Sequence, residues 1–110
     1  MTFHVITPRR ARQDYERCLD YIAAHSKPGA VSWAKAFDKA LARLEDFADT
    51  CPLAVEDDRV DFEVREIPFK TRRGLKYRIL FTIQDGSVVI LHVRGPGQDY
   101  LESEEIRRPE

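Results

Sequence analysis

The sequence contains few of the residues that would indicate a disulfide-linked, metal-binding or membrane protein. It has two cysteines and three histidines, and none of their spacings matches a metal site. No apolar run approaches the ~20 residues that span a bilayer, and Pro8, Arg9 and Arg10 interrupt any apolar leader near the N-terminus. We therefore expect a cytoplasmic protein with reduced thiols, no metal or other cofactor, and no membrane partner.

Neither sign of charge is in large excess, since the formal net charge is −1. Overall charge therefore does not predict nucleic-acid binding. The charges are nevertheless clustered, with a basic segment at Lys70–Arg78 and acidic segments at Glu56–Asp61 and Asp99–Glu105. Such blocks are typical of solvated surface. The basic segment adjoins Phe69, so it is also a candidate contact for nucleic acid or a ribosome.

Apolar residues at spacings of three and four predict two helices after a short strand at residues 2–7. The first helix is expected to end at Lys27-Pro28-Gly29, and the second to run from Ala30 to a point before Cys51-Pro52. The connection is short, so the helices should form an antiparallel hairpin.

Three strands are expected in the second half of the chain. Residues 62–69 form the first, with a bulge or strand end at Glu66 or Pro68, and residues 77–84 and 87–94 form a hairpin around Asp85-Gly86. The order β-αα-βββ predicts an α+β fold in which both helices cover one face of a three-stranded antiparallel sheet. At 110 residues the chain is expected to be one domain, 1–110, with a weakly structured tail at 98–110.

A two-residue turn at Asp85-Gly86 fixes the expected hairpin register. Phe81 then faces Ile90, Tyr77 faces Arg94, and His92 points towards the helices. The opposite face carries Arg78 together with four apolar residues, namely Leu80, Val89, Leu91 and Val93. An apolar face of this size is expected to be covered by a partner segment or by the tail.

The ordered pattern over residues ~3–100 resembles the RelE/ParE superfamily of toxins from type II toxin–antitoxin systems. The residues that carry the resemblance are Leu19-Asp20-Tyr21-Ile22, Cys51-Pro52-Leu53-Ala54, Val64-Arg65-Glu66, Tyr77-Arg78-Ile79-Leu80-Phe81 and Val88-Val89-Ile90-Leu91-His92-Val93-Arg94. The resemblance implies a toxin that is neutralised by a cognate antitoxin, encoded nearby. It further implies one of two targets. RelE-like members cut mRNA on the ribosome, whereas ParE-like members poison DNA gyrase.

Cleavage by RelE-like members relies on cationic residues that move protons and stabilise charge on the phosphate. The resemblance places Arg78 on the family's middle-strand arginine and Arg65 on a basic position of the preceding strand. It places Glu63 where a lysine is expected, and Gly95-Pro96-Gly97-Gln98 where a basic run is expected. If the chain were a nuclease, its candidate catalytic residues would be Arg65, Arg78, Arg94 and Tyr100.

These two losses of positive charge favour the ParE-like branch and gyrase. The alternatives are a ribosome-dependent mRNA endonuclease and an inactive member that retains only antitoxin binding. The expected target contacts are Arg65, Lys70, Arg72, Arg73 and Arg78, and the expected antitoxin contacts are Leu80, Val89, Leu91 and Val93.

Two arginines also have structural interpretations. Arg78 would form an ion pair with an acid such as Glu63, and Arg94 would stack on Tyr77. As a partly exposed residue, Arg78 is expected to be replaceable by alanine without loss of the fold.

Overall fold

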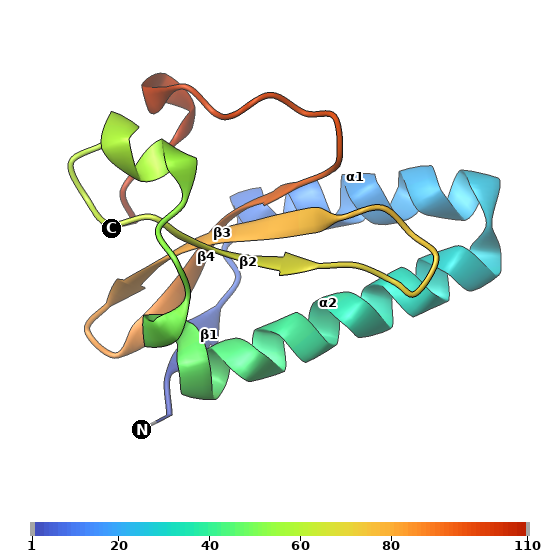
Figure 1. The fold of residues 1–110 in the computed structure, drawn as a ribbon, viewed down its shortest axis with the longest axis horizontal. Helices are drawn as coiled ribbons and strands as arrows, with labels where there is room; N and C mark the ends of the chain where they lie inside the picture. Colours follow the sequence, from blue (N-terminus) through green and yellow to red (C-terminus); the bar gives the residue numbers. More distant parts are fainter. Residues whose placement is uncertain (1, 110) are drawn as a thin grey trace.

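The computed structural model describes residues 2–109 and confirms the α+β fold (Figure 1). The strands and long helices are β1 (His4–Ile6), α1 (Arg9–His25), α2 (Lys27–Phe47), β2 (Arg65–Phe69), β3 (Tyr77–Gln84) and β4 (Ser87–Arg94). Three short 3-10 helices lie in the connections, η1 (Ala48–Thr50), η2 (Val55–Arg59) and η3 (Ser103–Glu105). No helix within residues 2–109 is long and apolar enough to cross a membrane.

The sheet has four strands rather than the expected three, in the order β1-β4-β3-β2. The N-terminal strand is part of this sheet, because β1 pairs in parallel with β4, with His4 opposite Ser87. The β3–β4 hairpin alone would leave the outer backbone groups of β4 without partners. β1 supplies partners for three residues of β4, Ser87–Val89. The edge strand of the sheet on this side is therefore only three residues long.

Both helices pack on one face of the sheet, as the apolar spacing predicted. Buried residues of the helices and of the strand face beneath them form one cluster, in which Trp33 and Phe37 contact the ring of Phe69. A break separates the helices as expected, but it does not lie at Lys27-Pro28-Gly29, because these residues form the first turn of α2. Ser26 alone separates the helices, and its hydroxyl accepts a hydrogen bond from the Gly29 amide at 3.0 Å. Proline is tolerated there because first-turn amides need no partner within the helix.

The β3–β4 hairpin begins in the expected register and then changes it. Asp85 and Gly86 both have positive φ, and Phe81 lies opposite Ile90 as predicted. A bulge follows, since the next residue of β3, Leu80, lies opposite His92 and leaves Leu91 as the extra residue. Neither the bulge nor the strand end expected at Glu66 or Pro68 is present, because β2 pairs regularly with β3 as far as Phe69; it begins at Arg65 rather than at residue 62.

The β4 bulge changes which side chains share a face, because side chains alternate along a strand. Val93 lies opposite Ile79 and joins the cluster under the helices, so its expected place on the other face is wrong. Arg94 lies opposite Arg78, not opposite Tyr77. Leu80 and Leu91 remain on the face away from the helices, which we call the outer face.

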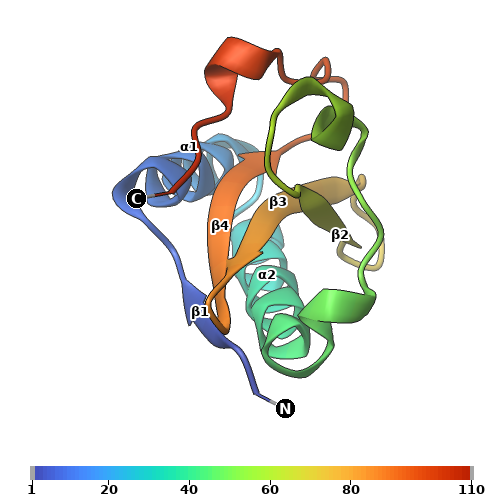
Figure 2. The same cartoon turned by 90° about the vertical axis from the view of Figure 1, so that its left-hand side faces the viewer.

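The outer face is covered by two segments of the same chain, the loop at 54–64 and the tail at 98–109 (Figure 2). Leu101 and Ile106 of the tail are 1% and 5% exposed and pack with Leu80, Leu91 and Val64. The tail has only one short 3-10 helix, yet Gln84 donates a hydrogen bond to the Pro109 carbonyl. Apolar burial therefore fixes a segment whose sequence lacks periodicity.

We expect Leu101→Ala to lower the free energy of unfolding by about 2–5 kcal/mol, because it leaves a cavity between the tail and the sheet. Urea denaturation followed by circular dichroism measures the change. Leu75→Ala is the control, because Leu75 is 70% exposed. Equal stability of the two variants would show that the tail does not pack on the outer face.

Candidate functional site

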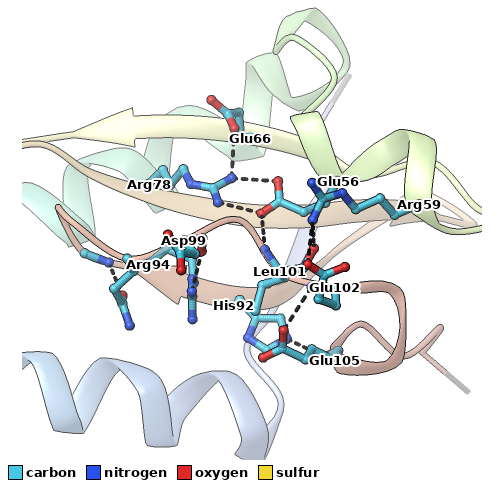
Figure 3. Close-up of polar contacts among 12 residues, drawn as sticks. Glu56, Arg59, Glu66, Arg78, His92, Arg94, Asp99, Leu101, Glu102 and Glu105 are labelled. Atoms are coloured by element: carbon cyan, nitrogen blue, oxygen red, sulfur yellow. Dashed lines mark hydrogen bonds and ion pairs between the residues drawn. The ribbon is translucent and has the colours of Figure 1, made fainter.

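Arg78 lies in the centre of a polar cluster on the outer face (Figure 3). Its guanidinium donates to both carboxylate oxygens of Glu56, at 2.8 Å for Nη1 to Oε1, and to Oε1 of Glu66 at 3.2 Å. The ring of Tyr100 covers it, with the guanidinium carbon 5.1 Å from the ring centroid. We call these four residues the Arg78 cluster. Arg78 does pair with carboxylates, but with Glu56 and Glu66 rather than with the expected Glu63.

Glu56 is fully buried although it lies in the acidic segment that was expected to be solvated surface. Besides its contacts with Arg78, its Oε2 accepts a hydrogen bond from the Leu101 amide at 3.1 Å. Burial by itself raises the pKa of Glu56. The hydrogen bonds from Arg78 and Leu101 outweigh burial and hold the pKa below its ordinary value. The same pairing with Glu56 raises the pKa of Arg78. The cluster is therefore charged and internally compensated.

The turn Gly95-Pro96-Gly97-Gln98 leads the tail onto the outer face. The Gly95 amide donates to the Gln98 side chain at 2.5 Å, and Gly97 has φ of 78°. A side chain at residue 97 would be strained in this conformation. The segment where the resemblance places a basic run is thus used to turn the chain.

Arg94 lies beside this turn and contacts the tail. It donates to the Asp99 carbonyl at 2.6 Å, and together with Arg78 and Tyr100 it lines a small cavity of about 290 Å³. Three of the four candidate nuclease residues are therefore brought together.

Arg65, the fourth, lies on the other side of the sheet. It is opposite Phe81 in the β2–β3 pairing, in phase with the core residues Ile67 and Phe69. Its side chain donates to Glu63 at 2.7 Å and to the Cys51 carbonyl. Arg65 and Arg78 thus face opposite sides of the sheet and do not converge on one phosphate.

The four expected antitoxin contacts are not exposed together. Leu80 and Leu91 are buried under the tail and the 54–64 loop, and Val93 is buried under the helices. Val89 is 6% exposed and lies near Arg107 and Pro109. The sequence predicted that a partner segment or the tail covers this face. For Leu80 and Leu91 the tail is the cover, because tail residues contact both side chains.

Three of the expected target contacts remain accessible. Lys70, Arg72 and Arg73 are exposed in the loop between β2 and β3. None of the three forms an ion pair with a residue in the 2–109 range. The other two, Arg65 and Arg78, are each bound to carboxylates.

A second buried polar group joins α1, β4 and the tail. His92 lies 3.2 Å from an Asp14 carboxylate oxygen through Nδ1 and 3.0 Å from the Glu105 carbonyl through Nε2. Because His92 lies opposite Leu80, it shares the outer face, so the expectation that it points towards the helices is wrong; from this face it contacts both Asp14 of α1 and the tail. Burial raises the pKa of Asp14, but hydrogen bonds from His92, Arg10 and the Val93 amide hold it below its ordinary value.

Residues that sequence reasoning missed are Glu56, Glu66 and Asp14. Their only sequence signal was indirect, since a basic residue in an apolar strand requires a carboxylate partner from somewhere in the chain. In the described part of the chain, no group of three His, Cys, Asp or Glu side chains could hold a metal ion.

The chain is an α+β protein with two helices on one face of a four-stranded sheet. A family model described as "ParE toxin of type II toxin-antitoxin system, parDE" matches residues 5–100. The chain therefore belongs to the ParE toxin family, and the resemblance to RelE/ParE toxins is confirmed. This membership implies a protein antitoxin as its partner. No curated protein and no solved structure matches the chain significantly.

We expect Arg78→Ala to destabilise the fold by about 3–5 kcal/mol, because it leaves the buried carboxylate of Glu56 without its partner. This replaces the expectation that the fold tolerates the change, because the Arg78 side chain is only 16% exposed. Urea denaturation at neutral pH measures the loss, with the exposed Arg72→Ala as control. Glu56→Gln/Arg78→Met should recover much of the stability, because no buried charge remains. A loss for Arg78→Ala no larger than for Arg72→Ala would contradict the structural role.

We also expect Glu56 to make stability depend on pH in the acidic range. Since its pKa is lower in the folded than in the unfolded state, it stabilises the fold above its ordinary pKa of 4.5. That contribution is lost as the pH falls through the lowered value. The measurement is the difference in unfolding free energy between wild type and Glu56→Gln, from about pH 6 down to about pH 3. Asp14 is present in both proteins, so the difference isolates Glu56. A difference that does not shrink on acidification would contradict this assignment.

Proposed function

We propose that this protein is a ParE-type toxin that acts in the cytoplasm by binding DNA gyrase, does not cut RNA, and is neutralised by its antitoxin. The observation that carries the proposal is that Arg65 and Arg78 are both bound to carboxylates of the same chain. A cationic nuclease needs several positive groups free to meet one phosphate.

The arginines of the sheet do not meet this requirement. Arg78 is held by two carboxylates and covered by Tyr100, and Arg65 is held by Glu63 on the opposite face. The tail also lies across the outer face, where an RNA strand would have to approach Arg78 and Arg94. These contacts support a binding function over an acid–base one.

The exposed basic loop is the surface we assign to the target. Lys70, Arg72 and Arg73 are free to form charged contacts across an interface, and arginine is frequent among residues that dominate binding energy. The loop connects two strands of the sheet, so a rigid base carries it.

We expect the purified protein to inhibit gyrase and to stabilise cleaved gyrase–DNA complexes, while mRNA in intoxicated cells stays intact. Lys70→Ala/Arg72→Ala/Arg73→Ala should weaken gyrase inhibition about tenfold or more, because it removes three charges from the interface. Supercoiling assays measure the first effect, and primer extension on cellular mRNA measures the second.

The matched control is Lys35→Ala/Lys39→Ala/Arg43→Ala, which removes three exposed charges from α2. This variant should inhibit gyrase like the wild type. New mRNA cuts at ribosome-bound codons, without gyrase inhibition, would overturn the proposal in favour of the endonuclease alternative. Normal growth despite abundant folded protein would favour the inactive member.

A further inference from the structure

A groove of about 690 Å³ lies at the end of the molecule where the α1–α2 connection meets the basic loop, at the right-hand end of Figure 1. Its volume is within the range of about 300–1,000 Å³ that is typical of small-molecule sites. Aromatic side chains from three elements line it, namely Tyr21 of α1, Trp33 of α2 and Tyr77 of β3. The groove shares no residue with the Arg78 cluster.

Trp33 carries a buried hydrogen-bond donor that the fold does not use. The residue is 2% exposed, and its indole Nε1 has no acceptor among residues 2–109. Within the core the indole packs against the rings of Tyr15, Phe37 and Phe69, which supply no acceptor to it. A buried tryptophan N–H usually has a partner, because leaving it unpaired is costly. Since Trp33 lines the groove, an acceptor can approach the indole from that side.

Two tyrosines add flat surface and a neutral hydroxyl to the groove. The ring of Tyr77 lies 5.4 Å from the indole of Trp33, with an angle of 69° between the two planes. Burial raises the pKa of Tyr77, with smaller contributions from Cys18 and Tyr21, so its phenol is neutral near pH 7. Tyr21 is 66% exposed. A planar ring can pack against these side chains.

The charged side chains of the groove are cationic. Arg17 and Arg73 line it, and none of its described lining residues is acidic. Arg17 is 72% exposed and lies 3.6 Å from Asp14 Oδ1, an oxygen that Arg10 already binds at 2.8 Å. Arg73 is exposed and has no ion pair within residues 2–109. Guanidinium groups of this kind bind carboxylate and phosphate groups.

We propose that the groove binds a small planar heteroaromatic anion, that is, a ring that carries a carboxylate or a phosphate group. The ring packs against Tyr21 and Tyr77, a ring heteroatom accepts the hydrogen bond of Trp33 Nε1, and Arg17 and Arg73 bind the anionic group. A small molecule fits the groove better than a flat protein surface does, because the unused donor is buried. Such binding does not depend on which target the toxin has.

The first test compares two anions with their neutral counterparts. Adenosine 5′-monophosphate represents nucleotides and nicotinate represents free aromatic acids, while adenosine and nicotinamide carry the same rings without the charge. We expect at least one anion to bind once per chain, about tenfold or more tightly than its neutral counterpart, because the arginines recognise the anionic group. Isothermal titration calorimetry measures the affinities. Trp33 is the only tryptophan in the sequence, so its fluorescence should change on binding.

The second test uses variants of the groove with a matched control. Arg17→Gln/Arg73→Gln should weaken binding of the anion about tenfold or more. Arg12→Gln/Arg43→Gln removes two exposed charges outside the groove and should bind like the wild type. Trp33→Phe keeps an aromatic ring but removes the N–H, so it should also weaken binding, measured by calorimetry. Circular dichroism checks that each variant is folded, and the arginine variants test the site even if Trp33→Phe is not.

Binding of adenosine 5′-monophosphate alone would assign the groove to nucleotides, and binding of nicotinate alone would assign it to small aromatic acids. Equal affinity for each anion and its neutral counterpart, or equal binding by the two double variants, would overturn the proposed chemistry. Failure of both anions to bind at millimolar concentration would overturn the ligand site. Dimer formation by the wild type that Arg17→Gln/Arg73→Gln abolishes, without anion binding, would assign the groove to a second copy instead. Gyrase inhibition is measured separately, so none of these results decides the proposed function.

Discussion

The carboxylate of Glu56 has no exposed surface, and it is held by Arg78 and by the Leu101 amide. This one group connects three segments far apart in the sequence: the 54–64 loop, strand β3 and the tail. A buried ion pair contributes little net stability over an apolar replacement, but loss of one partner costs several kcal/mol, about 3–5 in typical cases. The pair therefore fixes the arrangement of the outer layer, while Leu101, Ile106 and Leu80 supply the apolar burial. Because the pair is complete, the charge of Arg78 is compensated within the fold.

Local patterns were sufficient to predict the helices and the hairpin. The spacing of Trp33, Phe37, Ala40 and Leu44 indicated a buried helical face, and Asp85-Gly86 fixed the start of the β3–β4 register. The pairing of β1 with β4 could not be predicted in this way, since three residues carry too little pattern to specify a partner strand. The β4 bulge was missed for a related reason. Every residue around Leu91 is apolar, so either register buries apolar side chains, and packing under the tail decides between them.

In the candidate site, too, local patterns predicted some features, and others depend on tertiary contacts. Sequence reasoning singled out Arg78 and considered an ion pair for it, because a charge among apolar residues needs compensation. It chose the wrong acid, since Glu63 lies close in sequence to the acidic segment that contains Glu56, and only the fold shows which side chain is turned inward. That Arg65 and Arg78 face opposite sides of the sheet could not be predicted, because they belong to different strands whose relative register the sequence did not define. The basic loop was correctly treated as accessible, and the open groove beside it depends on tertiary contacts that no local pattern predicts.

The dependence of the outer layer on the tail has a consequence for biosynthesis. Residues 98–109 are the last described residues to leave the ribosome, and without them Leu80, Leu91 and Glu56 lack their cover. The helices and sheet can form earlier, because domains generally organise from the N-terminal side during translation. The nascent toxin therefore passes through a stage in which its sheet presents a bare apolar surface. It reaches its final form only after translation of the tail, so a chain terminated before Leu101 would be a target for aggregation and proteolysis rather than a shorter toxin.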